Sequence, residues 1–165
     1  MESTMKLLGH PVHQQLVSLP LGMLAAAVLL DLIGLVAGGP GPMLAAAAYW
    51  VLALGVAAAL LAAPFGLIDL MAIPAGTRAA RIGRLHGLGN LVVVALFGAS
   101  WWLRHVYAQQ PATIAMGLSF AGAALALGTA WLGGELVSRL GVGVADGANV
   151  DAPSSLDHQP VVEQR

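Results

Sequence analysis

Four long apolar stretches, separated by short segments rich in glycine, proline or charge, dominate the chain. They predict four membrane-spanning helices, because a helix needs about 20 apolar residues to cross the hydrocarbon core. The expected spans are residues 14–37, 43–73, 85–106 and 112–138. The pattern therefore predicts an all-α fold, an integral-membrane four-helix bundle formed by residues 1–140.

The two ends of this pattern need separate treatment. Small residues follow the first stretch, as they would follow a cleavable signal peptide, but the stretch is longer than a usual signal and contains Asp31, so we favour a span. Residues 141–165 are rich in Gly, Asp, Ser, Pro and Gln and show little periodic hydrophobicity. We therefore expect a disordered polar tail.

Composition supports a membrane protein and excludes several kinds of site. Only 9% of the residues are charged, whereas soluble domains have about 25%. A net charge of −1, with basic residues scattered at helix ends, argues against nucleic-acid binding. Because the chain has no cysteine, any metal or haem must be held by histidine, carboxylate or methionine. No nucleophile motif accompanies the serines, and whether the protein is an enzyme stays open.

Basic residues predict the orientation of the spans, because Lys and Arg are retained on the cytoplasmic side during insertion. Arg104 alone falls on one side of the predicted membrane. The opposite side holds Lys6, Arg78, Arg81, Arg84 and Arg139. We therefore expect a bacterial inner-membrane protein with both termini in the cytoplasm. An aromatic belt is expected at the outer face, formed by Trp50, Trp101, Trp102 and Tyr107.

Ionisable residues from all four spans fall at the cytoplasmic end of the predicted bundle. This predicted cluster consists of His10, His13, Asp69, His86 and Glu135. His10 and His13 are expected at the start of the first helix, on one side, and His86 shares a helix face with Asn90. Polar groups in lipid need partners, so the cluster is the main functional candidate.

Three chemistries and one structural role fit the predicted cluster. Two or three imidazoles with Asp69 or Glu135 suit a divalent metal such as zinc, iron or manganese. Alternatively, His13 or His10 opposite His86 could ligate haem b, with Arg81 or Arg84 near a propionate. Histidines and carboxylates can also relay protons. The structural alternative is that these groups hydrogen-bond across helices and hold the bundle together without a ligand.

Asp31 lies inside the first span, toward the outer face, about 27 Å along the helix from His13. A carboxylate at that depth needs a partner. Arg104 and His105 end the third span on the same side, so we expect Asp31 to pair with one of them rather than line an ion path.

Several motifs resemble a family of small bacterial four-span membrane proteins, domain of unknown function 2231. They are His10-Pro11-x-His13 with Pro20 and Asp31, GLIDL around Asp69, the spacing from Arg81 through His86 to Asn90, and WLGGELV from Trp131. Members are sometimes fused to iron–sulfur or cytochrome-like modules, so the resemblance implies a redox setting without an agreed activity. Members often carry Tyr and His after GGELV. This chain has Ser138 and Leu140 there, so one possible ligand is missing.

Together these observations predict a small membrane protein that is a haem- or metal-associated redox component. The second hypothesis is a non-catalytic subunit or scaffold of a larger membrane or redox complex, in which the predicted cluster serves only helix packing. The lipid bilayer is the expected surrounding in both cases.

Overall fold

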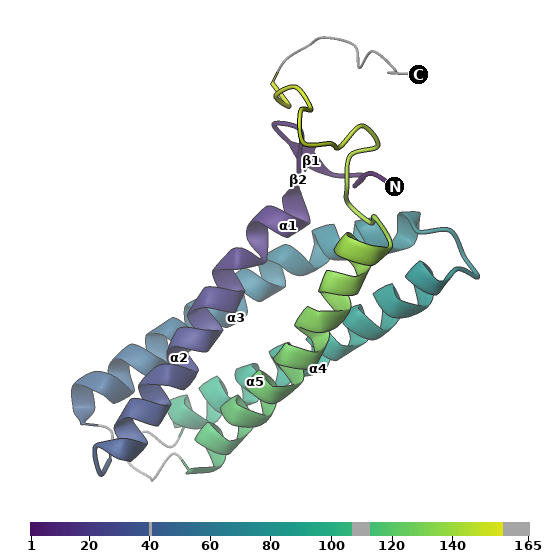
Figure 1. The fold of residues 1–165 in the computed structure, drawn as a ribbon. Coiled ribbons are helices and arrows are strands. Elements are labelled where there is room, and N and C mark those ends of the chain that lie inside the picture. Colours follow the sequence, from purple (N-terminus) through teal and green to yellow (C-terminus); the bar gives the residue numbers. More distant parts are fainter. Residues whose placement is uncertain (40, 107–112, 157–165) are drawn as a thin grey trace.

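The computed structural model describes residues 1–39, 41–106 and 113–156, and almost all of its regular structure is helical (Figure 1). The first span is formed by α1 (Val12–Leu16) and α2 (Ser18–Val36). The others are α3 (Pro42–Ala72), α4 (Arg78–Val106), and α5 (Thr113–Gly134) with a π-helical end, η1 (Glu135–Arg139). All four spans are long and apolar enough to cross a membrane. The predicted all-α bundle is thus confirmed.

The third span begins earlier than its hydropathy indicates. Helix α4 starts at Arg78 rather than near residue 85, so the three arginines expected in a connection belong to the helix. The Thr77 hydroxyl accepts a hydrogen bond from the Ala80 N–H at 3.1 Å, which caps the first turn. Such a cap stabilises a polar first turn as helix. Hydropathy alone does not detect a helical turn of this kind.

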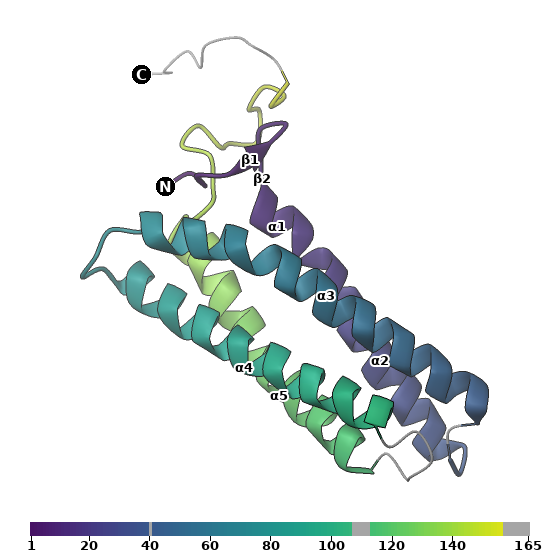
Figure 2. The same ribbon diagram turned by 180° about the vertical axis from the view of Figure 1, so that it is seen from behind.

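The helices pack as two antiparallel hairpins, α2 with α3 and α4 with α5 (Figures 1 and 2). Between the hairpins, α2 contacts α5 and α4 contacts α3. Helices α2 and α4 therefore lie diagonally across the bundle. A buried cluster fills the middle, formed by Leu24, Ala27, Leu52, Val93 and Phe97. Many leucines on the outside are more than half exposed, among them Leu21, Leu29, Leu60, Leu91 and Leu127. Such an apolar exterior is suited to lipid.

The N-terminus and residues 141–156 lie at one end of the bundle, which we call the terminal end (Figure 2). There the N-terminal segment forms a short antiparallel pair, β1 (Lys6–Leu7) with β2 (His10–Pro11). Residues 141–156 run beside it in irregular turns, and the Gly143 N–H donates to the Met1 carbonyl at 2.9 Å. The disorder expected of residues 141–165 stays a prediction.

Aromatic side chains gather at the opposite end, where α3 begins and α4 ends. The Tyr49 hydroxyl is 3.1 Å from His105 Nδ1, and the Trp101 and His105 rings are stacked with centroids 6.2 Å apart. Trp50 lies edge-on to Tyr49, and Trp102 lies against His105. Three members of the expected aromatic belt therefore share this end; the fourth, Tyr107, lies outside the described residues.

Candidate functional site

His13 lies near the start of the first span and reaches across to α3. Its Nδ1 is 3.1 Å from the Ala62 carbonyl oxygen, which can only accept, so Nδ1 carries the proton. The ring edge lies against Gly66, where a Cβ would come within 2.6 Å of Cε1. This leaves Nε2 as the basic nitrogen, and it makes no hydrogen bond with the described residues.

His86 repeats this arrangement on the other hairpin. Its Nδ1 donates to the Thr129 carbonyl oxygen of α5 at 2.8 Å. The ring edge lies against Gly133, where a Cβ would be 3.1 Å from Cε1. Here Nε2 has a partner, because the Asn90 amide donates to it at 3.1 Å. The Thr129 hydroxyl in turn donates to Asn90 Oδ1 at 2.9 Å, which fixes the amide.

His13 and His86 are therefore held alike by the two hairpins at the terminal end of the bundle. Each ring is half-buried. In both, Nδ1 is hydrogen-bonded to a carbonyl of the facing helix. Histidines that ligate a metal commonly show this fixation, because it sets the tautomer and orients the ring.

The other members of the predicted cluster have different partners. His10 belongs to β2 rather than to the first helix, is exposed, and lies 3.3 Å from Ser155 Oγ through Nε2. Glu135 pairs with Arg78 at 2.6 Å. The predicted haem-propionate residue Arg81 is exposed in the first turns of α4. Among the described residues, no group of three His, Asp or Glu side chains is arranged to hold a metal ion.

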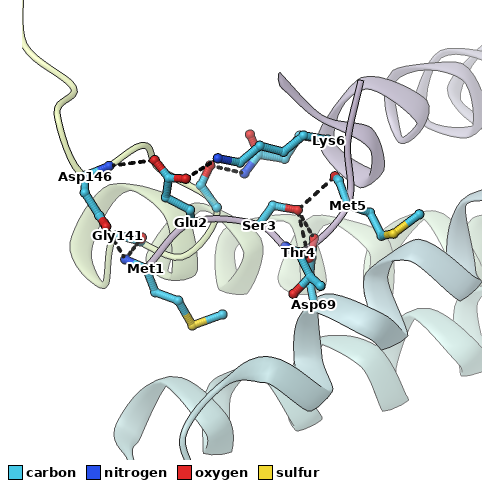
Figure 3. Close-up of polar contacts among 11 residues, drawn as sticks. Met1, Glu2, Ser3, Thr4, Met5, Lys6, Asp69, Gly141 and Asp146 are labelled. Carbon is cyan, nitrogen blue, oxygen red and sulfur yellow. Dashed lines mark hydrogen bonds and ion pairs between the residues drawn. The ribbon is translucent and has the colours of Figure 1, made fainter. Parts of the chain in front are cut away.

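Asp69 anchors the N-terminal segment to the end of α3 (Figure 3). The Ser3 hydroxyl donates to the carboxylate at 2.8 Å, and the Thr4 N–H donates to Oδ1 at 2.9 Å. Nearby, Lys6 donates to Glu2 and lowers the pKa of that exposed carboxyl, with a further contribution from the Asp146 N–H. Asp69 thus binds the chain's own N-terminal segment.

The predicted partner of Asp31 is confirmed. Arg104 donates to both carboxylate oxygens, at 2.8 and 2.6 Å, and both side chains are at most 9% exposed. Arg104 Nε also lies 3.3 Å from the Ser100 hydroxyl, and Ser100 and Ser119 are hydrogen-bonded at 2.8 Å. A bidentate pair in a buried polar network satisfies a charge that lipid would not.

Several contacting groups were not identified from the sequence. Gly66 and Gly133 receive the two imidazoles, and Thr129 completes the hydrogen-bond network of Asn90. The only sequence signal was a glycine shortly before each carboxylate, Gly66 three residues before Asp69 and Gly133 two residues before Glu135. Such glycines indicate only ordinary small-residue packing. Their role becomes visible only when the facing helix is in place.

Comparison with known families agrees with this architecture. The family model described as predicted membrane protein (DUF2231) matches residues 9–146, which include both histidines, the Asp31–Arg104 pair and all four spans. No curated protein and no solved structure matches the chain. The chain therefore belongs to the DUF2231 family of predicted membrane proteins.

Proposed function

We propose that this protein binds haem b between His13 and His86 and acts as an electron-transfer component of the bacterial inner membrane. The observation that carries the proposal is the matched fixation of the two imidazoles: each Nδ1 donates to a carbonyl of the facing helix, and each ring rests on a glycine. Two histidines with oriented Nε2 atoms are the axial ligand set of many haem proteins.

The ligand set favours haem over a divalent metal ion. A protein-bound zinc or iron ion normally takes at least three protein ligands. His10, Asp69 and Glu135 each bind another part of the chain, and no three-member group is present among the described side chains. Haem b needs only two imidazoles, since the porphyrin supplies the other four nitrogens.

Haem binding would displace a hydrogen bond of one of the two histidines. Within the part of the chain that the structure describes, Nε2 of His13 has no hydrogen bond to displace, whereas Nε2 of His86 accepts one from Asn90. The Asn90 amide would have to give way to the iron and keep its contact with Thr129. Arg81, exposed on the same helix, is available to a propionate at the membrane surface.

An absorption spectrum of the detergent-purified protein, produced with a haem supply, tests the proposal. We expect a Soret band that is lost in both His13→Ala and His86→Ala, with the four spans still inserted. His105→Ala and His10→Ala are matched controls, because both rings bind elsewhere, and they should keep the band. A folded wild-type protein without a Soret band would contradict the proposal.

The same experiment addresses the alternative function, a scaffold that packs within a larger membrane complex. The observation in its favour is that His86, Asp69 and Glu135 already bind protein groups that join helices or segments. In that case His86→Ala lowers the thermal stability, and neither the wild-type protein nor any variant shows a Soret band. Gentle solubilisation then recovers a stable partner. Stoichiometric metal without haem would instead support the divalent-ion site.

A further inference from the structure

Residues with the same role recur at a constant distance along the chain. His13 and His86 are 73 positions apart, and so are Leu24 and Phe97. Leu24 and Phe97 are both buried, and each packs against a glycine of the next helix. At Gly55 a Cβ would lie 2.8 Å from the Leu24 side chain, and at Gly122 it would lie 3.0 Å from the Phe97 ring.

The receiving helices α3 and α5 show their own constant spacing, of 67 positions. Gly55 and Gly122 are this far apart, and so are Gly66 and Gly133, the two glycines under the imidazoles. The carbonyls that accept from the two histidines belong to Ala62 and Thr129, which have the same spacing. Each of these contacts of the first hairpin thus has a counterpart in the second.

The buried positions follow the same two spacings. In α2 the buried residues include Pro20, Leu24 and Ala27, whose counterparts Val93, Phe97 and Ser100 are buried in α4. In α3 the buried residues are Ala48, Leu52, Gly55 and Ala62. Their counterparts Ala115, Ser119, Gly122 and Thr129 are all buried in α5. Few of these pairs are identical, so the repeat lies in burial and contact rather than in sequence.

We propose that the chain consists of two tandem copies of one helical hairpin, and that Asp31 and Arg104, at equivalent positions of the two copies, form the contact that fixes one copy against the other. Asp31 and Arg104 are also 73 positions apart, and they bind each other. Two equivalent residues can meet only on the axis that relates the copies. Because α2 and α4 are diagonal, that two-fold axis runs lengthwise between them.

This axis gives the ion pair a positioning role. His13 and His86 occupy equivalent positions near one end of this axis, so the register set by Asp31 and Arg104 determines how the two imidazoles are placed relative to each other. The two copies differ in the residues next to the ion pair. Ser100 and Ser119 bind Arg104, and their counterparts Ala27 and Leu52 are apolar. The second copy therefore supplies both the guanidinium and the serine hydroxyls that bind it. This inference does not depend on haem binding.

Exchange of the charged residues across the axis, in the full chain, tests the equivalence. Asp31→Arg and Arg104→Asp, made singly, place like charges together and should abolish the cooperative thermal transition measured in detergent. Made together, the two substitutions restore opposite charges, and the transition should return. Its midpoint should be below that of the wild type, because Ser100 and Ser119 remain in the second copy, away from the new arginine. Adding Ala27→Ser, Leu52→Ser, Ser100→Ala and Ser119→Leu moves the serines and should raise the midpoint toward the wild-type value.

The order of these midpoints decides the inference. Rescue by the double exchange, improved further by the six-site exchange, supports two equivalent copies. The same four apolar–serine exchanges made in the wild-type background are the matched control and should lower the midpoint. A six-site variant no more stable than the double exchange would overturn the equivalence, and a double exchange no better than the single reversals would overturn the role of the pair.

Discussion

At the scale of single residues, two glycines do more than allow helices to approach. Gly66 and Gly133 leave space for the edges of the His13 and His86 rings, while a carbonyl one turn earlier accepts from each Nδ1. A larger residue would push the ring away from its carbonyl. The orientation of each imidazole thus depends on a residue that carries no functional group.

Replacing these glycines by alanine tests that dependence. Gly66→Ala and Gly133→Ala should each destabilise the protein by about 1–3 kcal/mol, the usual cost of forcing extra volume into a packed site. Thermal unfolding in detergent measures the change, and any Soret band should shift or weaken with it. Gly98→Ala, where an added Cβ meets nothing within 4 Å, is the matched control and should be neutral or stabilising. Equal behaviour of all three variants would refute the role.

At the scale of elements, hydropathy and turn residues predicted the number and order of the spans and the shared end of the polar residues. The spans themselves are long and apolar, so their pattern is strong. Side-chain partners could not be predicted, because they depend on how each helix is rotated about its axis. Asp31 is the exception: one span held a lone carboxylate and another a lone arginine at the same depth. Glu135, in contrast, begins the π-helical end of the last span and faces Arg78, a partner not expected from the sequence.

The early start of α4 depends on its cap. Thr77→Ala removes the hydroxyl that binds the Ala80 N–H and should cost about 1 kcal/mol, while Thr77→Ser keeps the cap and should cost less. Thermal unfolding gives the stabilities, and hydrogen exchange of residues 78–84 should show local fraying in the alanine variant only. Unchanged exchange would mean that packing, not the cap, holds the first turns.

At the scale of the whole molecule, most of the basic residues lie at one end of the bundle. Arg78 at the start of α4 pairs with Glu135 near the end of the last span, at the terminal end of the bundle. The aromatic cluster lies at the other end, where α3 begins and α4 ends. Positively charged residues remain on the cytoplasmic side, so we expect the terminal end, and the two histidines with it, to face the cytoplasm.

Single introduced cysteines can report this orientation, because the natural chain has none. Met43 and Val150 are 81% and 100% exposed and lie at opposite ends of the bundle. In spheroplasts, a membrane-impermeant maleimide should label Met43→Cys at once and Val150→Cys only after permeabilisation. The reverse pattern would place both termini outside the cell.

The dominance of contacts within each hairpin also bears on how the protein is made. Helices α2 and α3 are consecutive and pack mainly on each other, as do α4 and α5. We expect the first hairpin to form while the second is still being synthesised, since neighbouring segments meet before distant ones. Asp31 would then lie in the membrane without its partner, because Arg104 is 73 residues later in the chain. Its burial would be completed only when the fourth span has been translated and the two hairpins join.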